Sequence, residues 1–334
     1  MLHDTYYKRF LNLRKEHITA VSEFVVLFHS KKIGIRMQPY ISVIIPTYNR
    51  KEMLKKCLKS VLSVNYPKYR YEVIVIDDGS TDGTYEFLME VAKEHQNLRI
   101  LRQENRGPAA ARNLGIRNAK GEILFFTDDD CVVPKDWIKI FLEVFEEYPE
   151  IAGVGGYLEA PNEILKSNIF ARYESLMSEI LYKPKSTGFY IGGVETPCVV
   201  TNNCAYKKEV LKEVGGFDEN FSVAAGEDAD LKLRICLKGY KLAYVPIKVE
   251  HYHEYTFNRF IKQTITRKRG DIYFMQKWSK YLEERRKKEG IKYKDNLLFL
   301  KLLRFGGLKY SIIHLSLKFV EFLTVVVTWW KRLR

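Results

Sequence analysis

Short β-branched runs alternate with helical stretches through the first half of this chain, and this alternation restricts the possible folds more than any other feature. Such runs occupy residues 41–45, 72–76, 98–101 and 123–127, and a helical stretch at about 108–119 separates the last two. Strands that alternate with helices usually pair in parallel, joined by right-handed crossovers. The sequence therefore predicts an α/β fold with a Rossmann-like, mostly parallel central sheet flanked by helices.

The second half of the chain mixes shorter elements, and we interpret it as the half that would bind a second substrate, the acceptor. Strands are expected at about 151–159, 198–206 and 241–249, and helices at about 163–181, 207–214 and 227–238. The sequence shows neither an internal repeat nor a low-complexity segment. One catalytic domain over residues 40–270 accounts for this pattern.

Polar residues follow three of the predicted strands at the points where the strands end. They are Tyr48 and Asn49 after the first strand, Asp77 and Asp78 after the second, and Asp128, Asp129 and Asp130 after the fourth. Ligands of open parallel sheets bind beyond the carboxyl ends of the strands. We therefore expect these groups to share one edge of the sheet.

The acidic triplet Asp128, Asp129 and Asp130 is the sharpest chemical signal. It follows an apolar run, and adjacent carboxylates at a buried strand end raise one another's pKa unless a cation neutralises them. Mg²⁺ or Mn²⁺ suits such a group, because each takes one or two carboxylates and fills its other positions with phosphate oxygens and water. That arrangement would neutralise a diphosphate leaving group. A solvated turn is the alternative, and the apolar strand before the triplet argues against it.

Other motifs suit a nucleotide. Asp78 can accept a hydrogen bond from a base N–H, and Tyr48, in the segment that begins at Pro46, offers an aromatic face for stacking. A helix of small residues begins after Gly107 and places Arg112 one turn in, where close approach is possible. Turn capping and simple helix packing are the alternatives for these motifs.

A second acidic pair, Glu227 and Asp228, opens a predicted helix. Acidic residues are favoured in a first helical turn by the helix dipole, so capping is one interpretation. The other is a general base that takes a proton from an acceptor hydroxyl. His251 and His253 follow the last predicted strand. They are either structural or complete a metal shell with nearby carboxylates.

In their order along the chain, these segments resemble family 2 glycosyltransferases. The matching motifs lie at residues 41–49, 76–84, 105–113, 126–130, 215–218 and 226–228. The resemblance covers about residues 40–270 and implies a GT-A fold, a UDP- or GDP-sugar donor, a divalent metal and inversion at the anomeric carbon. It also implies a hydroxyl acceptor, a glycan or a lipid-linked one, in cell-surface polysaccharide or glycolipid synthesis.

The resemblance assigns residues to the donor site. Tyr48 and Asp78 would contact the base, and Asp128 would contact the ribose or the metal. The other residues of these motifs that we place around the nucleotide sugar are Pro46, Asn49, Arg112 and Asp129.

Metal binding and proton transfer fall to further residues of the matched motifs. Asp130 would hold the metal, with Asp128 as a further ligand and His251 matching the family's metal-binding histidine. Asp228 would be the catalytic base, and Glu227 is the second candidate. One in-line displacement, with the metal stabilising the departing diphosphate, would invert the configuration.

Three alternatives are weighed against this interpretation. Processive synthases of this family carry a QxxRW motif, whereas the nearest segment, residues 263–268, has the wrong spacing and no Trp, so we expect single transfers. A sugar nucleotidyltransferase would carry a glycine-rich basic loop after its first strand, which residues 46–50 are not. A non-catalytic nucleotide-sugar-binding scaffold at the membrane would be favoured by the loss of an acidic motif, and none is lost.

The formal net charge of +14 lies at the two ends of the chain. Residues 1–39 hold 7 basic and 3 acidic side chains, residues 251–334 hold 20 and 7, and the middle holds 28 and 31. A nucleic-acid partner would suit a uniformly basic surface, so we expect none. Basic ends suit an enzyme held against anionic lipid headgroups, and a solvated lysine-rich surface is the alternative. Five cysteines without a CxxC pair and no secretory signal favour the cytoplasmic side of the cell membrane.

Helical extensions are expected at both ends. Residues 1–39 hold apolar side chains at the spacing of an amphipathic helix. Residues 271–334 are expected to form a basic, membrane-associating region, and residues 296–330 within it are apolar enough to suggest a membrane span. One polar stripe follows helical spacing along them: Lys301, Arg304, Gly307, Ser311, His314, Lys318 and Glu321. A charge near the bilayer centre costs ~2.5–3.5 kcal/mol, so we expect this helix to lie in the interface rather than to span. Packing of its apolar face on the protein is the third possibility.

Overall fold

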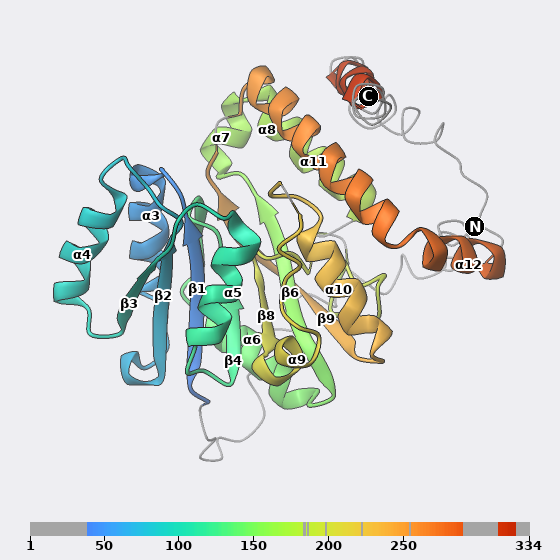
Figure 1. The fold of residues 1–334 in the computed structure, drawn as a ribbon. Coiled ribbons are helices and arrows are strands. Elements are labelled where there is room, and N and C mark those ends of the chain that lie inside the picture. The colour runs from blue at the N-terminus through green and yellow to red at the C-terminus, as the bar shows by residue number, and fades with distance from the viewer. Residues whose placement is uncertain are drawn as a thin grey trace.

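The computed structural model describes residues 39–182, 185, 187–197, 199–221, 223–253, 255–289 and 313–324. Within these residues the strands form one nine-stranded sheet in the order β3-β2-β1-β4-β8-β6-β9-β5, and β7 also pairs with β9 (Figure 1). The strands are β1 (Ile41–Thr47), β2 (Tyr71–Asp77), β3 (Leu98–Arg102), β4 (Ile123–Phe126), β5 (Cys131–Val132), β6 (Ile151–Glu159), β7 (Tyr190–Gly192), β8 (Cys204–Lys207) and β9 (Lys241–His251).

The sheet is parallel on one side and mixed on the other. β1 pairs in parallel with both β2 and β4, and β2 pairs in parallel with β3. β8 runs antiparallel to β4 and β6, whereas β6 and β9 are parallel. The short β5 and β7 run antiparallel to β9. The predicted mostly parallel sheet is confirmed, and its first four strands begin and end within two residues of the predicted positions.

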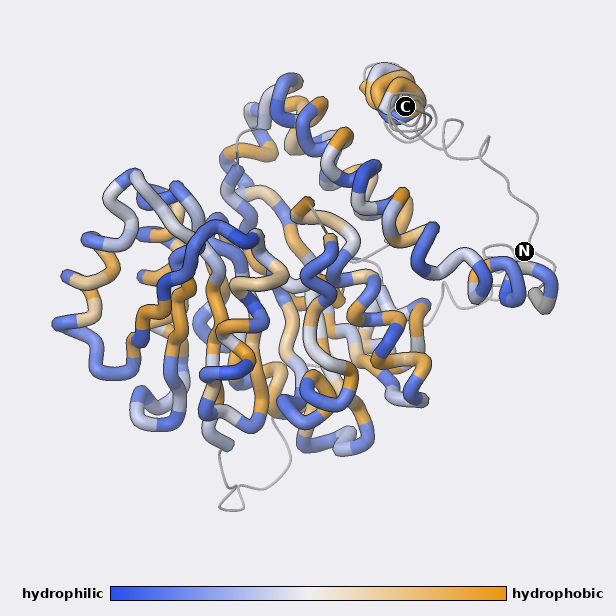
Figure 2. Tube along the Cα trace, in the orientation of Figure 1, coloured by the Kyte–Doolittle hydropathy of each residue, from blue (hydrophilic) through white to orange (hydrophobic). Residues whose placement is uncertain are grey.

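Helices cover both faces of the sheet, because successive strand side chains point to opposite faces. Val43 of β1 lies in one apolar cluster and its neighbour Ile44 in the other. The first cluster includes residues of α3 (Lys51–Val61), α4 (Thr84–Glu94) and α6 (Trp137–Glu147). The second includes residues of α5 (Pro108–Asn118), α9 (Lys208–Glu213) and α10 (Glu227–Leu237). Figure 2 shows hydrophobic residues concentrated in the strands. A short 3₁₀ helix, η1 (Lys68–Arg70), leads into β2.

The helix expected at 163–181 is in fact two helices, α7 (Asn162–Ser167) and α8 (Ile169–Tyr182). Asn168 between them is extended, with φ −111° and ψ 123°. Its Oδ1 accepts hydrogen bonds from the amides of Phe170 and Ala171. Asn168 therefore caps the N-terminus of α8, and helical periodicity on both sides concealed the break.

The strand expected at 198–206 is shorter than predicted, because β8 begins at Cys204. The preceding Asn203 is buried, and its side-chain amide donates to the carbonyls of Tyr157 in β6 and Ile247 in β9. The register between these two strands shifts at this place. Asn203 thus satisfies backbone groups that the irregular pairing leaves open.

Two of the last described helices, α11 (Phe257–Lys277) and the helix at residues 313–324, attach to the domain through a third, smaller apolar cluster. α11, α12 (Ser279–Glu289) and the helix at residues 313–324 follow β9. Tyr173 of α8, Phe260 of α11 and Leu317 share this cluster. α11 continues through residue 270, where the predicted catalytic domain ends.

The described residues cover only part of the predicted extensions. Residues 1–38, 296–312 and 325–330, on which the N-terminal helix and most of the interfacial helix were placed, lie outside them. Within the part of the chain that is described, no helix is long and apolar enough to cross a membrane.

Candidate functional site

The carboxyl ends of β1, β2 and β4 bring the predicted polar groups to one edge of the sheet. Thr47 at the end of β1 pairs with Asp77 at the end of β2, and the acidic triplet follows β4 after Thr127. From the other half of the sheet, His251 at the end of β9 pairs with Cys131, the residue after the triplet. Both halves of the chain therefore contribute to one site.

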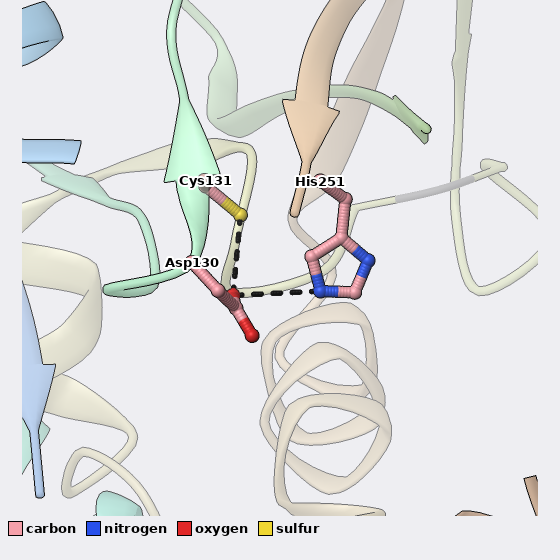
Figure 3. A group of neighbouring side chains, drawn as sticks. All are labelled: Asp130, Cys131 and His251. Atoms are coloured by element: carbon pink, nitrogen blue, oxygen red, sulfur yellow. Dashed lines mark hydrogen bonds and ion pairs between the residues drawn. The ribbon is translucent and has the colours of Figure 1, made fainter. Parts of the chain in front are cut away.

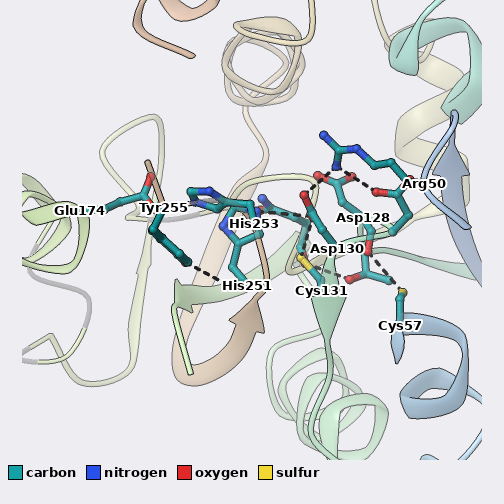
Figure 4. Close-up of polar contacts among 12 residues, drawn as sticks. Arg50, Cys57, Asp128, Asp130, Cys131, Glu174, His251, His253 and Tyr255 are labelled. Atoms are coloured by element: carbon teal, nitrogen blue, oxygen red, sulfur yellow. Dashed lines mark hydrogen bonds and ion pairs between the residues drawn. The ribbon is translucent and has the colours of Figure 1, made fainter. Parts of the chain in front are cut away.

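Two carboxylates of the triplet are buried and share one arginine. Asp129 accepts hydrogen bonds from Thr47 Oγ1 at 2.8 Å and from Arg50 Nη1 at 3.1 Å. Asp130 accepts from the same arginine nitrogen at 2.7 Å, and His251 Nε2 lies 3.4 Å from its Oδ1. Figure 4 shows Arg50 and His251 on opposite sides of Asp130. Arg50 therefore neutralises part of the negative charge of Asp129 and Asp130. From the sequence, only a metal was expected to do so.

The pKa values of these two carboxyls diverge. Burial raises the pKa of Asp129 to about 7, with Asp130 adding to the shift and Arg50 opposing it. Burial acts on Asp130 in the same direction, but contact with His251 and Arg50 outweighs it and holds the pKa of Asp130 below its ordinary value. Asp130 is thus the ionised member and the better cation ligand.

Asp130, Cys131 and His251 each place one donor atom within 4.8 Å of the others (Figure 3). The carboxylate and the imidazole suit Mn²⁺, and the carboxylate also suits Mg²⁺. Cys131 is fully buried, and burial raises the pKa of its thiol well above the ordinary value, so it stays protonated and is a poor ligand. The residues present therefore fit a divalent cation at Asp130 and His251.

Arg112 connects the triplet to the second acidic pair. Its side chain is 4% exposed, and it bonds Asp128 Oδ1 at 2.8 Å and Glu227 Oε1 at 2.9 Å. Contacts of this type between a buried guanidinium and carboxylates are among the stronger hydrogen bonds in proteins. Arg112 and Asp128, both placed in the donor site from the sequence, thus lie side by side.

Asp228 differs from Glu227 in its surroundings. Asp228 is partly exposed and accepts a hydrogen bond from the amide of Ala229 at 2.7 Å, within its own turn. Burial raises the pKa of Asp228 and raises the pKa of Glu227 to about 6, with Arg112 opposing both shifts. Glu227 is buried and bound to Arg112, so Asp228 is the carboxylate better placed to meet an acceptor hydroxyl.

On the donor side, Asp78 holds a loop in place. Its carboxylate accepts from Gln103 Nε2 at 2.7 Å and from the amides of Arg106 and Gly107 at 2.9 and 2.8 Å. The first part of this loop, with Gly79, lines an open cavity of about 550 Å³. This hollow is largely open to solvent and lies beside Asp78, the residue that the sequence places at the base.

The other predicted donor residues lie near the end of β1. Tyr48 is 45% exposed, as a stacking side chain must be. Asn49 has a φ of 52°. Its side-chain Oδ1 accepts a hydrogen bond from the backbone amide of Thr81, and its backbone amide donates one to Ser80 Oγ. Pro46 is buried within β1. Asn49 therefore ties the loop after β1 to the loop after β2, whereas Pro46 is part of the strand.

Three residues of the site were missed in the sequence: Thr47, Arg50 and Glu174. Thr47 and Arg50 flank a predicted motif at the strand end, and that adjacency was the available signal. Glu174 comes from α8 and lies 3.0 Å from His253 Nε2. Nothing local to the helical sequence of α8 marks it.

Comparisons with known proteins were made by family model, by sequence and by structure. A family model described as glycosyl transferase family 2 matches residues 42–215. Glycosyltransferase AglE of Haloferax volcanii is 31% identical over 237 residues, which cover 70% of this chain and 73% of that protein. The dolichyl N-acetyl-alpha-D-glucosaminyl phosphate 3-beta-D-2,3-diacetamido-2,3-dideoxy-beta-D-glucuronosyltransferase of Methanococcus voltae is 30% identical over 240 residues, which cover 68% and 71%.

A solved structure supports the fold. The mannosyltransferase of Pyrobaculum calidifontis superposes with a TM-score of 0.55 at 20% identity, over 95% of this chain and 84% of that one. The likeness confirms the expected GT-A fold.

Proposed function

The chain belongs to glycosyl transferase family 2, and from this premise we propose that it moves a sugar from a UDP- or GDP-sugar to a hydroxyl acceptor, inverting the anomeric carbon in one transfer. The observation that carries the proposal is a chain of contacts at one edge of the sheet: Arg112 bonds Asp128 of the triplet and also Glu227, the neighbour of Asp228, while Asp130 of the same triplet lies beside His251. A cation ligand, a fixed positive charge and a proton acceptor are what a displacement on a diphosphate sugar requires.

A nucleotide donor fits the parallel half of the sheet. The cavity beside Gly79 is lined by the loop that Asp78 holds, and Tyr48 is exposed at the end of β1. The Pyrobaculum calidifontis mannosyltransferase, which shares this fold, was solved with GDP-Man and Mn²⁺. These observations support a UDP- or GDP-sugar with a divalent cation.

Asp130 and His251 are the residues that would hold Mn²⁺ or Mg²⁺, with Asp128 near the same phosphates. When bound, the cation would neutralise the charge that builds on the departing diphosphate. Arg112 lies beside Asp128, and Arg50 lies beside Asp130. Both arginines keep the carboxylates of the triplet from repelling the donor phosphates.

Asp228 accepts the proton of the acceptor hydroxyl. The acceptor oxygen forms a bond to the anomeric carbon while the bond from that carbon to the diphosphate oxygen breaks, and the electron pair leaves with the diphosphate. Glu227 holds the first turn of α10 through Arg112 and so positions its neighbour. A single displacement of this kind inverts the configuration.

The acceptor that we propose is a glycan or a lipid-linked sugar at the cytoplasmic face of a membrane. The Methanococcus voltae relative is named for a dolichyl N-acetyl-alpha-D-glucosaminyl phosphate. The basic ends of the chain and exposed apolar side chains at residues 313–324 support contact with an anionic membrane surface. The absence of a QxxRW motif at residues 263–268 supports single rather than processive transfer.

A thermal-shift panel of UDP- and GDP-sugars, each with Mn²⁺ and with EDTA, tests the proposal. We expect one donor class to raise the melting temperature, and to do so only with Mn²⁺. Incubation of that donor with lipid-linked and free glycans, followed by NMR of the product, then reports the anomeric configuration. Stabilisation by a nucleoside triphosphate and a sugar phosphate, with none by nucleotide sugars, would instead favour a nucleotidyltransferase. Retention of configuration would exclude a single displacement.

A further inference from the structure

His251 forms a cluster with His253 and with Glu174 of α8. His251 and His253 are two residues apart, and their ring centroids lie 4.5 Å apart. His253 Nε2 is 3.0 Å from Glu174 Oε2, and one donor atom from each of the three residues lies within 4.8 Å of the others. Figure 4 shows Glu174 and His253 to one side of His251, and Asp130 to the other.

The separation between His253 and Glu174 is close to the one that a tetrahedral ion imposes. Ligand atoms about 2.0–2.1 Å from a tetrahedral Zn²⁺ lie about 3.3–3.4 Å apart. The 3.0 Å between His253 and Glu174 needs to open by only a few tenths of an ångström. The donor atom of His251 lies within 4.8 Å of the other two, so ion binding would require the His251 ring to move toward them by up to about 1.5 Å.

Oε2 of Glu174 is already oriented to act as a metal ligand. Arg267 Nη2 lies 3.3 Å from Oε1, while Oε2 faces His253. The ring of His253 is held in place by Tyr255, whose centroid is 3.9 Å away. Metal ligands are commonly oriented by such neighbouring contacts. The Glu174 side chain is 25% exposed, so a water molecule can reach the fourth position of a tetrahedral ion.

The donor set differs in chemistry from the one around Asp130. Two imidazoles and one carboxylate suit Zn²⁺, whereas carboxylates with phosphate oxygens suit Mg²⁺ and Mn²⁺. Zn²⁺ also binds nitrogen ligands more tightly than Mn²⁺ does. We propose that Glu174, His251 and His253 form a second metal site, selective for Zn²⁺, which shares His251 with the Asp130 site.

Sharing one imidazole makes the two sites compete. A Zn²⁺ ion on Glu174 and His253 draws His251 away from Asp130, and Mn²⁺ then has one ligand fewer. Zn²⁺ should therefore weaken Mn²⁺-dependent nucleotide binding. This consequence rests on the proposed function, whereas Zn²⁺ binding itself does not.

The first experiment titrates Co²⁺, a spectroscopic substitute for Zn²⁺, into the full chain without nucleotide, and then displaces it with Zn²⁺. We expect visible absorption of tetrahedral Co²⁺ that saturates at one ion per chain and disappears when Zn²⁺ is added. His253→Asn should abolish the absorption, and Glu174→Gln should weaken Co²⁺ binding at least about tenfold. His95→Asn, which removes a histidine elsewhere, should leave it unchanged, as should Asp130→Asn.

Several outcomes overturn the proposal. Absorption that survives in both His253→Asn and Glu174→Gln would place the ion elsewhere in the chain. Loss of the absorption in Cys131→Ser, or a thiolate charge-transfer band, would place it on the Asp130, Cys131 and His251 group. A spectrum of six-coordinate Co²⁺ would contradict a tetrahedral site. Glu174→Gln keeps a hydrogen-bonding partner for His253, so it tests the site even if His253→Asn does not fold.

The second experiment tests whether the two metal sites share His251. Zn²⁺ at the concentration that fills the Co²⁺ site should weaken Mn²⁺-dependent binding of UDP or GDP to the wild type, and about ten times more Zn²⁺ should be needed for the same effect in Glu174→Gln. Tetrahedral Co²⁺ binding without this competition would show that the two sites do not share His251. If neither nucleotide binds with Mn²⁺, the proposed function fails while the Co²⁺ result still stands.

Discussion

Arg112 and Arg50 determine how the carboxylates of the site divide their roles. Arg112 holds Glu227 at 2.9 Å, which leaves Asp228 in the same turn as the proposed proton acceptor. Arg50 lies between Asp129 and Asp130, at 3.1 and 2.7 Å. One arginine therefore distinguishes the proposed base from its neighbour, and the other holds two adjacent carboxylates together at the proposed cation site.

Asp228→Asn should keep donor binding and lower kcat by roughly 10²–10⁴-fold, the usual contribution of a general base. In the wild type, kcat should rise with pH as Asp228 loses its proton. The midpoint should lie above the ordinary aspartate value, because burial raises the pKa of Asp228. The variant should lack this rise. The measurement is kcat from about pH 4 to pH 8 with the donor that the panel identifies.

Glu227→Gln is the matched comparison, since it removes a carboxylate from the same turn. It should lower kcat less than Asp228→Asn does and should keep the rise with pH. If Asp228→Asn retains turnover within about tenfold of the wild type, Asp228 is a capping residue and Glu227 becomes the base.

Asp129→Asn should stabilise the metal-free protein at neutral pH. The pKa of Asp129 in the folded protein, about 7, lies above its ordinary value of 3.8. Between these values the folded chain keeps a proton that the unfolded chain has lost, so wild-type stability falls as pH rises through this window. The variant avoids that loss. We expect a gain of ~1–2 kcal/mol at about pH 8 and less at about pH 5, after Arg50 loses a charged partner.

Urea unfolding in EDTA at the two pH values measures this difference. An equal effect of Asp129→Asn at both would mean that Arg50 compensates the charge of Asp129 fully. The same variant should not gain stability when Mn²⁺ and nucleotide are bound, because the bound cation favours the ionised triplet.

At the scale of elements, α11 fixes the acidic turn at residues 226–228 from both sides. Before the turn, Gly270 approaches so closely that a Cβ on it would lie 2.2 Å from the carbonyl oxygen of Ala225. After the turn, Lys277 Nζ lies 2.7 Å from Asp230 Oδ1. The side chain of Asp230 is fully buried. The position of Asp228, the proposed base, therefore depends on α11, a helix outside the motifs that resemble the family.

Gly270→Ala should push α11 away from Ala225 and shift the acidic turn. A misplacement of about 1 Å at a catalytic group can cost roughly 10²-fold in rate, so we expect kcat to fall by about one to two orders of magnitude. Nucleotide affinity should change little, because the donor loops lie on other strands. Gly188→Ala is the control, since a Cβ there meets no atom within 4 Å. An unchanged kcat in Gly270→Ala would show that the turn keeps its place without α11.

The elements that depend on neighbours in the chain were predictable, and the contacts that depend on packing were not. The strands β1, β2, β3 and β4 follow from β-branched runs, and the shared edge follows from their parallel order. Arg50 reaches the triplet across the sheet edge, and Glu174 of α8 reaches His253 in the loop after β9. The position of Arg50 next to a predicted motif hinted at its role, whereas no local pattern indicates the contact of Glu174. The break at Asn168 was missed because apolar periodicity runs through a capping residue.

At the scale of the whole molecule, the helix at residues 313–324 contacts the catalytic domain through polar residues of its stripe. His314 is buried, with Nδ1 3.1 Å from the hydroxyl of Tyr173, and Glu321 lies 3.7 Å from Lys268 of α11. The large apolar side chains of this helix that stay exposed are Leu315, Phe319, Phe322 and Leu323. An outward apolar face beside basic residues suits the interface of an anionic membrane.

Replacing Leu315, Phe319 and Phe322 together by Ser should weaken binding of the full chain to anionic vesicles by at least about tenfold. Full burial of each such side chain contributes about 1.5–3 kcal/mol, and insertion into an interface recovers part of it. Co-sedimentation with vesicles that contain phosphatidylserine measures the binding, and high salt should weaken it further. Met89→Ser is the control, because Met89 is 45% exposed on α4.

Membrane fractions of expressing cells distinguish the modes of attachment. Release of the protein by high salt or alkaline carbonate agrees with a helix that lies in the interface. Extraction by detergent alone would mean that the C-terminal region spans the membrane. A protein found entirely in the soluble fraction would contradict both and would leave the exposed apolar residues without a membrane partner.

In the proposed mechanism, Asp130 holds a divalent cation that binds the donor's diphosphate. Isothermal titration of UDP and GDP into the wild type and into Asp130→Ala, each with Mn²⁺ and with EDTA, tests this role most directly. We predict that Mn²⁺ tightens the binding of one nucleotide to the wild type by at least about tenfold. Asp130→Ala should abolish this difference and leave the affinity in EDTA unchanged. A dependence on Mn²⁺ that survives in Asp130→Ala would remove Asp130 from the metal site and contradict the proposed mechanism.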